Sequence, residues 1–220
     1  METVSIIAAT MGVAWASGIN LYATIFMLGW LGSTGSLDLP PDLQVLANPM
    51  VMIAAGFMYC VEFFADKIPG VDTGWDAIHS FIRIPAGAML AAGAVGQLGP
   101  EAELVGLLLG GTLAAGSHFT KAGTRVIVNT SPEPFSNWGV SIGEDLVVIG
   151  GLWAALNYPV LFIVFLILFI ALVIWLAPKI WRGIKRIFKR IASWFGKDSK
   201  KEEQAASPNS DKVESEELLE

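Results

Sequence analysis

The sequence predicts an all-α membrane protein with six transmembrane helices. Hydrophobic residues make up 54% of the 220 residues and charged residues only 15%, whereas soluble domains carry about 25% charged residues. Residues 160–177 are consecutively apolar, a run long enough to cross most of a hydrocarbon core of about 30 Å. The 23 glycines lie largely in apolar runs, where they let helices pack closely. This composition argues against an ordinary water-soluble fold.

Six apolar stretches divide the chain into candidate spans. The last is the clearest, because it contains no Gly, Pro or charge between residues 160 and 177. The other five are interrupted by Gly and by polar residues. The six stretches cover residues 4–31, 49–65, 83–98, 104–120, 139–156 and 159–177.

The basic residues predict the orientation, because Lys and Arg are enriched on the cytoplasmic side of membrane proteins. With six crossings and a cytoplasmic C-terminus, all 14 Lys and Arg residues lie inside, and the outer loops around Asp38 and Glu101 contain none. Residues 1–5 lack the positive charge of a signal peptide, so we expect the first span to be retained. These patterns predict a membrane protein with both termini in the cytoplasm.

The charged C-terminal region is expected to lie outside a transmembrane domain of residues 1–178. From 179 to 196, Ile and Trp recur at helical spacing opposite a basic face, which predicts an amphipathic helix on the membrane surface. Its basic residues, Lys179 to Arg190, would contact anionic lipid headgroups, although a cluster that merely fixes topology is the alternative. Residues 197–220 are acidic and Ser-rich, so we expect disorder. No strongly basic domain suggests nucleic-acid binding.

Two short segments indicate an internal repeat. Residues 15–22 match residues 113–120 at three positions, which pair Ala16 with Ala114, Gly18 with Gly116 and Asn20 with His118. Because three spans separate the two segments, the halves, about 1–98 and 99–178, would form a three-plus-three inverted repeat of the kind found in transporters. Polar interruptions at matching places in such halves point to a substrate site, which makes Asn20 and His118 candidates. Coincidence is the alternative, because the identities are few.

Several charged residues lie within or beside the predicted spans. An ionised carboxylate in hydrocarbon costs about 2.5–3.5 kcal/mol, so the acids should face a partner or a water-filled cavity. Asp72, Asp76, His79 and Arg83 share one helical face, and Lys121 and Arg125 share another. We therefore expect a polar cavity on the cytoplasmic half. Its candidate residues are Glu62, Asp72, Asp76, His79, Arg83, Glu144, Asp145, Asn20 and His118.

These residues are compatible with more than one chemistry. Asp72, Asp76 and His79 offer ligands for a divalent cation, and His79 is also suited to proton transfer. Lys121 and Arg125 suit an anion or a lipid phosphate. The alternative is that all of these charges form structural ion pairs that fix helix packing.

Several kinds of site find no support in the sequence. The single cysteine, Cys60, excludes an intramolecular disulfide framework. The chain lacks the familiar nucleotide-binding, serine-hydrolase and zinc-protease motifs, and no other motif specifies a cofactor. Nothing in the sequence therefore supports an enzyme, and a bound cation is the one ligand that the charged residues suggest.

The order of several short motifs resembles a bacterial multi-spanning membrane family catalogued as domain of unknown function 4126. These motifs are the 16–18 run of small residues, Glu62, residues 68–72, Trp75-Asp76, Pro85-Ala86, residues 110–116, Asn137 and Glu144. The resemblance covers about residues 5–178, and Glu62, Asp72, Asp76 and Glu144 match the family pattern. It implies a multi-spanning fold in a bacterial inner membrane and no particular activity.

Together these observations favour a transporter or channel for a small solute or ion. Glu62, Glu144 and Asp145 would line its cavity, and Asp72, Asp76 and His79 would serve as gate or coupling residues. The alternative hypothesis is a lipid-handling protein or a membrane assembly scaffold, since basic residues lie in the inner loops and in the C-terminal helix. A homo-oligomer is compatible with either function.

Overall fold

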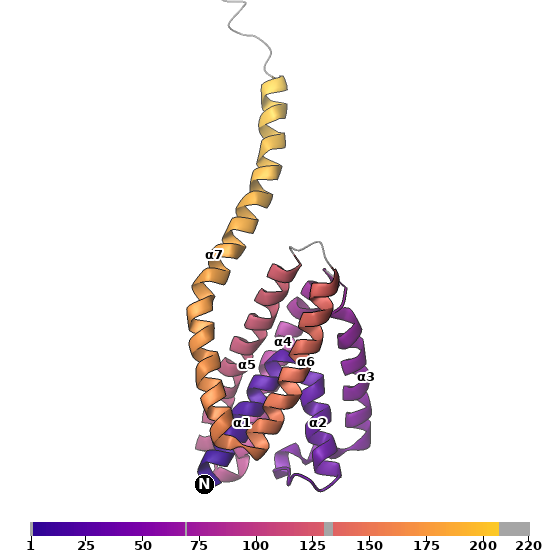
Figure 1. Ribbon diagram of the computed structural model, residues 1–220, viewed down its shortest axis with the longest axis vertical. Coiled ribbons are helices and arrows are strands. Elements are labelled where there is room, and N and C mark those ends of the chain that lie inside the picture. Colours follow the sequence, from indigo (N-terminus) through magenta and orange to yellow (C-terminus); the bar gives the residue numbers. More distant parts are fainter. Residues whose placement is uncertain (1, 69, 130–133, 207–220) are drawn as a thin grey trace, which may run out of the picture. The chain divides into compact units, whose positions relative to one another are not determined.

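The described part of the chain contains helices and no strand. A computed structural model describes residues 2–68, 70–129 and 134–206, without the side chains of 134, 180, 183–184 and 186–206. It divides into two units, residues up to Val173 and residues from Ile174, and the first contains the helix bundle (Figure 1). The helices are α1 (Glu2–Ile19), α2 (Leu21–Ser33), η1 (Pro41–Ala47), α3 (Pro49–Ala65), α4 (Val71–Val95), η2 (Gly96–Leu98), α5 (Pro100–Val128), α6 (Pro134–Asn157) and α7 (Pro159–Ala206).

The helix lengths and apolar composition agree with a membrane protein. Five helices, α1, α4 extended through η2, α5, α6 and the first part of α7, are long and apolar enough to cross a membrane. The count reaches six if η1 and α3, which are bent by 67° at Asn48, form one broken span. Asn48 caps α3 because its side chain accepts a hydrogen bond from the amide of Met50 at 2.9 Å. The membrane class is confirmed, and a count of six crossings is not.

The first predicted span, residues 4–31, is wrong as a single helix. Asn20 has an extended backbone (φ −143°, ψ 95°) that separates α1 from α2, and its side chain accepts a hydrogen bond from the amide of Ala23. The chain then turns back, since Leu28 of α2 lines the same small pocket as Thr10 and Val13 of α1. α1 and α2 therefore form a hairpin that begins and ends at the same end of the bundle (Figure 1).

The tip of this hairpin lies at the middle of the bundle. Gly12 packs against Ala155 near the end of α6, whereas Asn20, at the tip, donates a hydrogen bond to Asp145 in the middle of α6 at 3.0 Å. The hairpin therefore reaches only about half of the depth of α6. Hydropathy did not detect this reversal, because both arms are apolar.

Small residues bring α1, α4 and α5 into close contact. A Cβ atom added to Gly18 would collide with the Ala114 carbonyl, and one added to Gly110 would lie 3.5 Å from the Cβ of Ala14. These contacts, Ala14 with Gly110 and Gly18 with Ala114, follow the same order in both helices, so α1 and α5 run parallel. An inverted repeat requires these segments to run in opposite directions, so the contacts do not confirm it.

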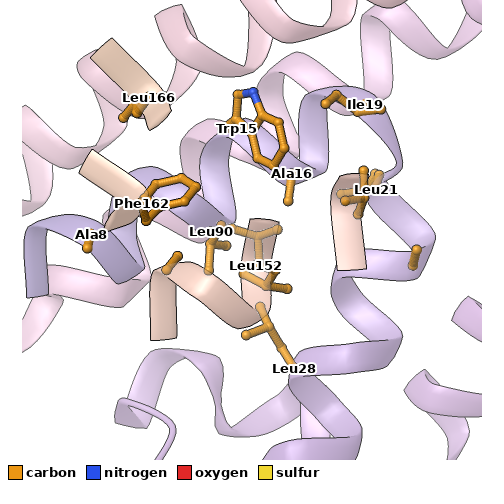
Figure 2. Packing of buried hydrophobic residues seen from close by; sticks show 14 of the residues in the cluster. Ala8, Trp15, Ala16, Ile19, Leu21, Leu28, Leu90, Leu152, Phe162 and Leu166 are labelled. Carbon is orange, nitrogen blue, oxygen red and sulfur yellow. The ribbon is translucent and has the colours of Figure 1, made fainter. Parts of the chain in front are cut away.

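An aromatic core joins α1 to α6 and α7. Trp15 is fully buried and meets the rings of Phe162, Phe165 and Phe169 edge-on, with centroids 5.2–6.0 Å apart. Figure 2 shows Trp15, Phe162 and Leu152 among the side chains of one buried hydrophobic cluster. This packing holds α1 within the bundle.

The C-terminal helix differs from its prediction. Its backbone continues through Pro178 to Ala206, whereas the sequence favoured a separate helix over 179–196 and disorder from 197. Pro178 cannot donate the helical hydrogen bond to the carbonyl of Ile174, but proline is tolerated within membrane helices. Arg182 donates a hydrogen bond to the carbonyl of Pro178 itself at 3.0 Å. A separate surface helix is not confirmed, and residues 207–220 lie outside the described residues.

Candidate functional site

The ends of α3 to α6 bring buried acids and bases together. Glu62 and Asp66 lie one helical turn apart at the end of α3, and Lys121 and Arg125 lie one turn apart on α5. Asp76 and Arg83 of α4 and Glu144 of α6 complete the set. Six of these side chains are 0–6% exposed and Glu144 is 15% exposed. We call these seven residues the charged network.

One arginine binds two acids on one side of the charged network. The guanidinium of Arg83 is 2.7 Å from Oε1 of Glu62 and 3.1 Å from Oδ1 of Asp76. Asp76 and Arg83 are separated by two turns of α4, so this helix holds both halves of the pair on one face. Arg83 thereby ties the end of α3 to α4.

A second arginine binds the other two acids. The guanidinium of Arg125 is 2.6 Å from Oε2 of Glu144 and 3.1 Å from Oδ2 of Asp66. It also donates a hydrogen bond to the backbone carbonyl of Asp66 at 2.7 Å. Arg125 therefore joins α5 and α6 to the residue that follows α3.

The ammonium of Lys121 lies between these two arginine pairs. It is 2.9 Å from Asp66 and 3.1 Å from Glu62, and 3.8 Å from both Asp76 and Glu144. The two shorter contacts are hydrogen bonds. Four carboxylates from three helices and the adjoining turn thus converge on one lysine, so Glu62 and Glu144 belong to a single site.

The charged network has one more carboxylate than cations. Four acids share Arg83, Lys121 and Arg125, so its formal charge is −1 when every group is ionised. Three carboxylate oxygens, Oε2 of Glu62, Oδ1 of Asp66 and Oδ2 of Asp76, are buried without a hydrogen-bond partner among the described residues. Buried acceptors of this kind require a donor, such as a proton or water. The same network holds buried donors without an acceptor among the described residues, Nε of Arg83 and Nε of Arg125, so its hydrogen bonds are incompletely paired and its formal charge is not balanced.

A second polar group lies at the tip of the hairpin. Asp145 accepts hydrogen bonds from the side-chain amide of Asn20 at 3.0 Å and from the hydroxyl of Tyr59 at 3.2 Å. Asn20 also caps α2, so its side chain both stabilises the start of that helix and hydrogen-bonds to α6. Asp145 therefore neighbours the charged network without joining its ion pairs.

The two histidines connect α4 to the hairpin and to α5. Nδ1 of His79 is 2.9 Å from the carbonyl of Trp75, so that nitrogen donates and Nε2 accepts a hydrogen bond from the hydroxyl of Tyr22. Nε2 of His118 is 2.7 Å from the hydroxyl of Ser80. Both rings sit beside the charged network and serve to join helices.

Asp72 lies outside the charged network. It accepts hydrogen bonds from the amides of Gly70 and Thr73, where a carboxylate favours the start of α4. Both carboxylate oxygens of Asp72 also accept hydrogen bonds from the side-chain amide of Asn129, at 2.8 and 2.9 Å. The side-chain oxygen of Asn129 in turn accepts a hydrogen bond from Asn137. This chain of polar groups ties together the ends of α4, α5 and α6.

Lys67 lies between α3 and α4, apart from the other bases. Its ammonium donates hydrogen bonds to the carbonyl of Phe63 and the hydroxyl of Ser141, and it lies over the ring of Phe63. Burial lowers the pKa of Lys67 below its usual value. Its contacts join α3 to α6 beside the charged network.

The geometry separates the hypotheses that the sequence left open. Within the described ranges, no group of three or more His, Cys, Asp and Glu side chains is arranged to hold a metal ion, so Asp72, Asp76 and His79 do not form such a centre. Lys121 and Arg125 point into ion pairs and are buried, so this conformation does not present them to a lipid phosphate. The side chains of the charged network are largely buried, and the water-filled cavity that the sequence suggested stays a prediction.

Sequence reasoning missed several residues of the site. Asp66 belongs to the charged network, and its position four residues after Glu62 was the available signal, since the same spacing identified Lys121 with Arg125. The hydrogen bonds of Tyr59, Asn129 and Asn137 were not predicted, although Asn137 was one of the motif residues, because they depend on contacts with other helices. No periodicity marks a neutral residue that binds an acid far away in the sequence.

Comparison with known proteins places the chain in a family. No curated protein and no solved structure matches it. Residues 7–179, which include every helix of the bundle and the whole charged network, match the model of one family. The chain therefore belongs to the family described as domain of unknown function 4126, DUF4126.

Proposed function

We propose that this protein is a membrane transporter for a small solute or ion, driven by protonation of the charged network. The observation that carries the proposal is the convergence of Glu62, Asp66, Asp76 and Glu144 on Lys121 with one carboxylate in excess. An uncompensated charge inside a membrane protein is costly. Binding one proton would neutralise the site, and losing it would favour opening to water.

The helix break at Asn20 supports the same proposal. In many transporters, interrupted helices meet near the bilayer midplane and present free backbone groups to substrate and coupling ion. Here the ends of α1 and α2 meet beside Asp145 at the middle of α6. The hairpin tip is held by residues that neighbour the charged network, because Tyr22 binds His79 and Asn20 binds Asp145. A change of charge in the network would therefore act on the tip through these neighbours.

We further propose that the end of the bundle with the charged network faces the cytoplasm. The loops at the opposite end, around Asp38 and Glu101, contain no Lys or Arg, as the enrichment of basic residues inside requires. Because the α1–α2 hairpin returns to the end where it began, residue 2 would face outside. This orientation replaces the expectation of two cytoplasmic termini, which assumed that residues 4–31 cross once.

The lipid-handling hypothesis has less support at this site. It expected headgroup binding by Lys121 and Arg125, whose charges are taken up by Glu62, Asp66 and Glu144. Replacing one of those ion pairs with a phosphate would require the network to open.

Proton flux into proteoliposomes tests the proposed function. Vesicles carrying the purified protein and a trapped pH-sensitive dye would receive gradients of Na⁺, K⁺ or Mg²⁺, each with and without a membrane potential. We expect the wild-type protein to move protons under at least one gradient, and Glu62→Gln and Glu144→Gln to abolish the movement. Glu101→Gln, an exposed acid at the opposite end of α5, is the matched control. Proton movement that both network variants leave unchanged would rule out the assignment, as would its absence from the wild-type protein under every gradient.

A further inference from the structure

An apolar groove lies on the flank of the bundle between α2, α3 and α6. It has a volume of about 760 Å³. One wall is formed by α2 between Ala23 and Leu31, another by Gly56 and Tyr59 of α3, and Ile149 of α6 contributes the third. Tyr59 turns its hydroxyl to Asp145, so its ring faces the groove. The groove is separate from the charged network.

The dimensions of the groove match one leaflet of a membrane. From Ala23 to Leu31 the helix rises about 12 Å, and one leaflet contributes about half of a hydrocarbon core of about 30 Å. The groove begins near the hairpin tip, at mid-depth, and follows α2 toward the end of the bundle where α1 begins. It therefore extends through one leaflet only.

The lining also indicates an apolar chain as the occupant. Phe26 and Trp30 are 39% and 57% exposed, and they stack with ring centroids 6.4 Å apart. Trp30 lies near the outer end of the groove, where aromatic residues favour the membrane interface. No charged residue lines it, so it offers nothing to hold a headgroup at mid-depth.

We propose that this groove binds one acyl chain of a phospholipid from the leaflet that contains α2. The acyl chain packs between α2 and α3, with its end against the ring of Tyr59. Because Tyr59 binds Asp145 and Asp145 binds Asn20, the bound chain stabilises the hairpin tip. The inference does not depend on the proposed transport function.

Variants that fill the groove test this proposal. A Cβ atom added to Gly56 would lie 3.3 Å from the ring of Phe26, so Gly56→Phe places its ring in the groove. Ile149→Trp fills it from the opposite wall. The control is Gly150→Phe, because Gly150 is exposed on the same helix with no atom within 4 Å of an added Cβ.

Native mass spectrometry of the detergent-purified protein measures phospholipid retained after extensive washing. We expect the wild-type protein and Gly150→Phe to retain one phospholipid, and Gly56→Phe and Ile149→Trp to lose it. Melting temperatures identify a variant that fails to fold, in which case the other filling variant decides. Retention by a folded filling variant, or no retained lipid in the wild-type protein, overturns the proposal. A wild-type dimer that the filling variants dissociate also overturns it, because a second copy would then be the occupant.

Discussion

Lys121 is the residue on which the charged network depends. Arg83 and Arg125 each bind two of the four carboxylates, whereas Lys121 lies within 4 Å of all four. Opposite charges in a poorly polarisable interior interact strongly, but they must first lose their hydration. The stability of the network therefore depends on the number of charges that it contains. The buried ammonium of Lys121 at its centre offsets the repulsion between the acids.

The excess carboxylate predicts unequal effects of removing an acid and removing a base. Glu144→Gln leaves three acids and three bases, so we expect its stability to stay within about 1 kcal/mol of the wild type. Arg125→Gln leaves Asp66 and Glu144 without their main partner, and losing one member of a buried pair costs about 3–5 kcal/mol. Thermal unfolding of the two variants in one detergent measures the difference. Equal losses of stability would show that the network behaves as balanced pairs.

The hairpin of α1 and α2 is the element that distinguishes this bundle from a simple series of spans. Its tip is held by Asn20, which caps α2 and binds Asp145, and α1 is held by the contacts of Gly12 and Gly18 with α6 and α5. A polar residue at mid-depth is tolerated because each of its groups has a partner. The break at Asn20 is therefore a stable feature of the fold.

The hairpin predicts that residues 2 and 36 lie on the same side of the membrane. Single cysteines at Glu2 and Ser36, introduced in the Cys60→Ser background, would be treated with a membrane-impermeant maleimide in intact cells. We expect both to be labelled, and Lys201→Cys to be labelled only after permeabilisation. If Glu2→Cys is protected while Ser36→Cys reacts, α1 crosses the membrane and the hairpin interpretation is wrong.

At the scale of the whole molecule, the bundle and the C-terminal part of α7 are separate units. The contacts that bind α7 to the aromatic core end at Phe169, and the family match ends at residue 179. All ion pairs of the charged network lie between residues 62 and 144. The contacts that stabilise the bundle are therefore made by residues before 180.

Truncation after Arg186 tests that division. This cut keeps Lys179, Arg182, Lys185 and Arg186, which help to retain the orientation. We expect the truncated protein to insert, to purify as a folded bundle and to melt within a few degrees of the full chain, because none of the network or aromatic contacts is removed. Truncation after Tyr158 is the comparison, since it exposes Trp15 and should lower the melting temperature strongly. A similar loss in both would contradict the division.

The sequence by itself determined the membrane class, the approximate places of the apolar helices after residue 49 and the end of the bundle that holds the charges. These properties follow from local composition, because each apolar run must be buried in lipid and each basic cluster resists translocation. It also identified six of the seven network residues, since charges in apolar helices stand out. Only the tertiary structure decided how they pair, because Lys121 meets Glu62 from 59 residues away.

The hairpin was likewise decided by tertiary contacts. Residues 4–31 read as one apolar run, and hydropathy does not distinguish a continuous helix from two antiparallel ones. The difference depends on Asn20 finding Asp145, 125 residues away, and on Gly18 lying against Ala114. Polar groups at mid-depth and glycine contacts can be interpreted only when the neighbouring helix is known. The order of residues along the chain does not by itself specify which helix that is.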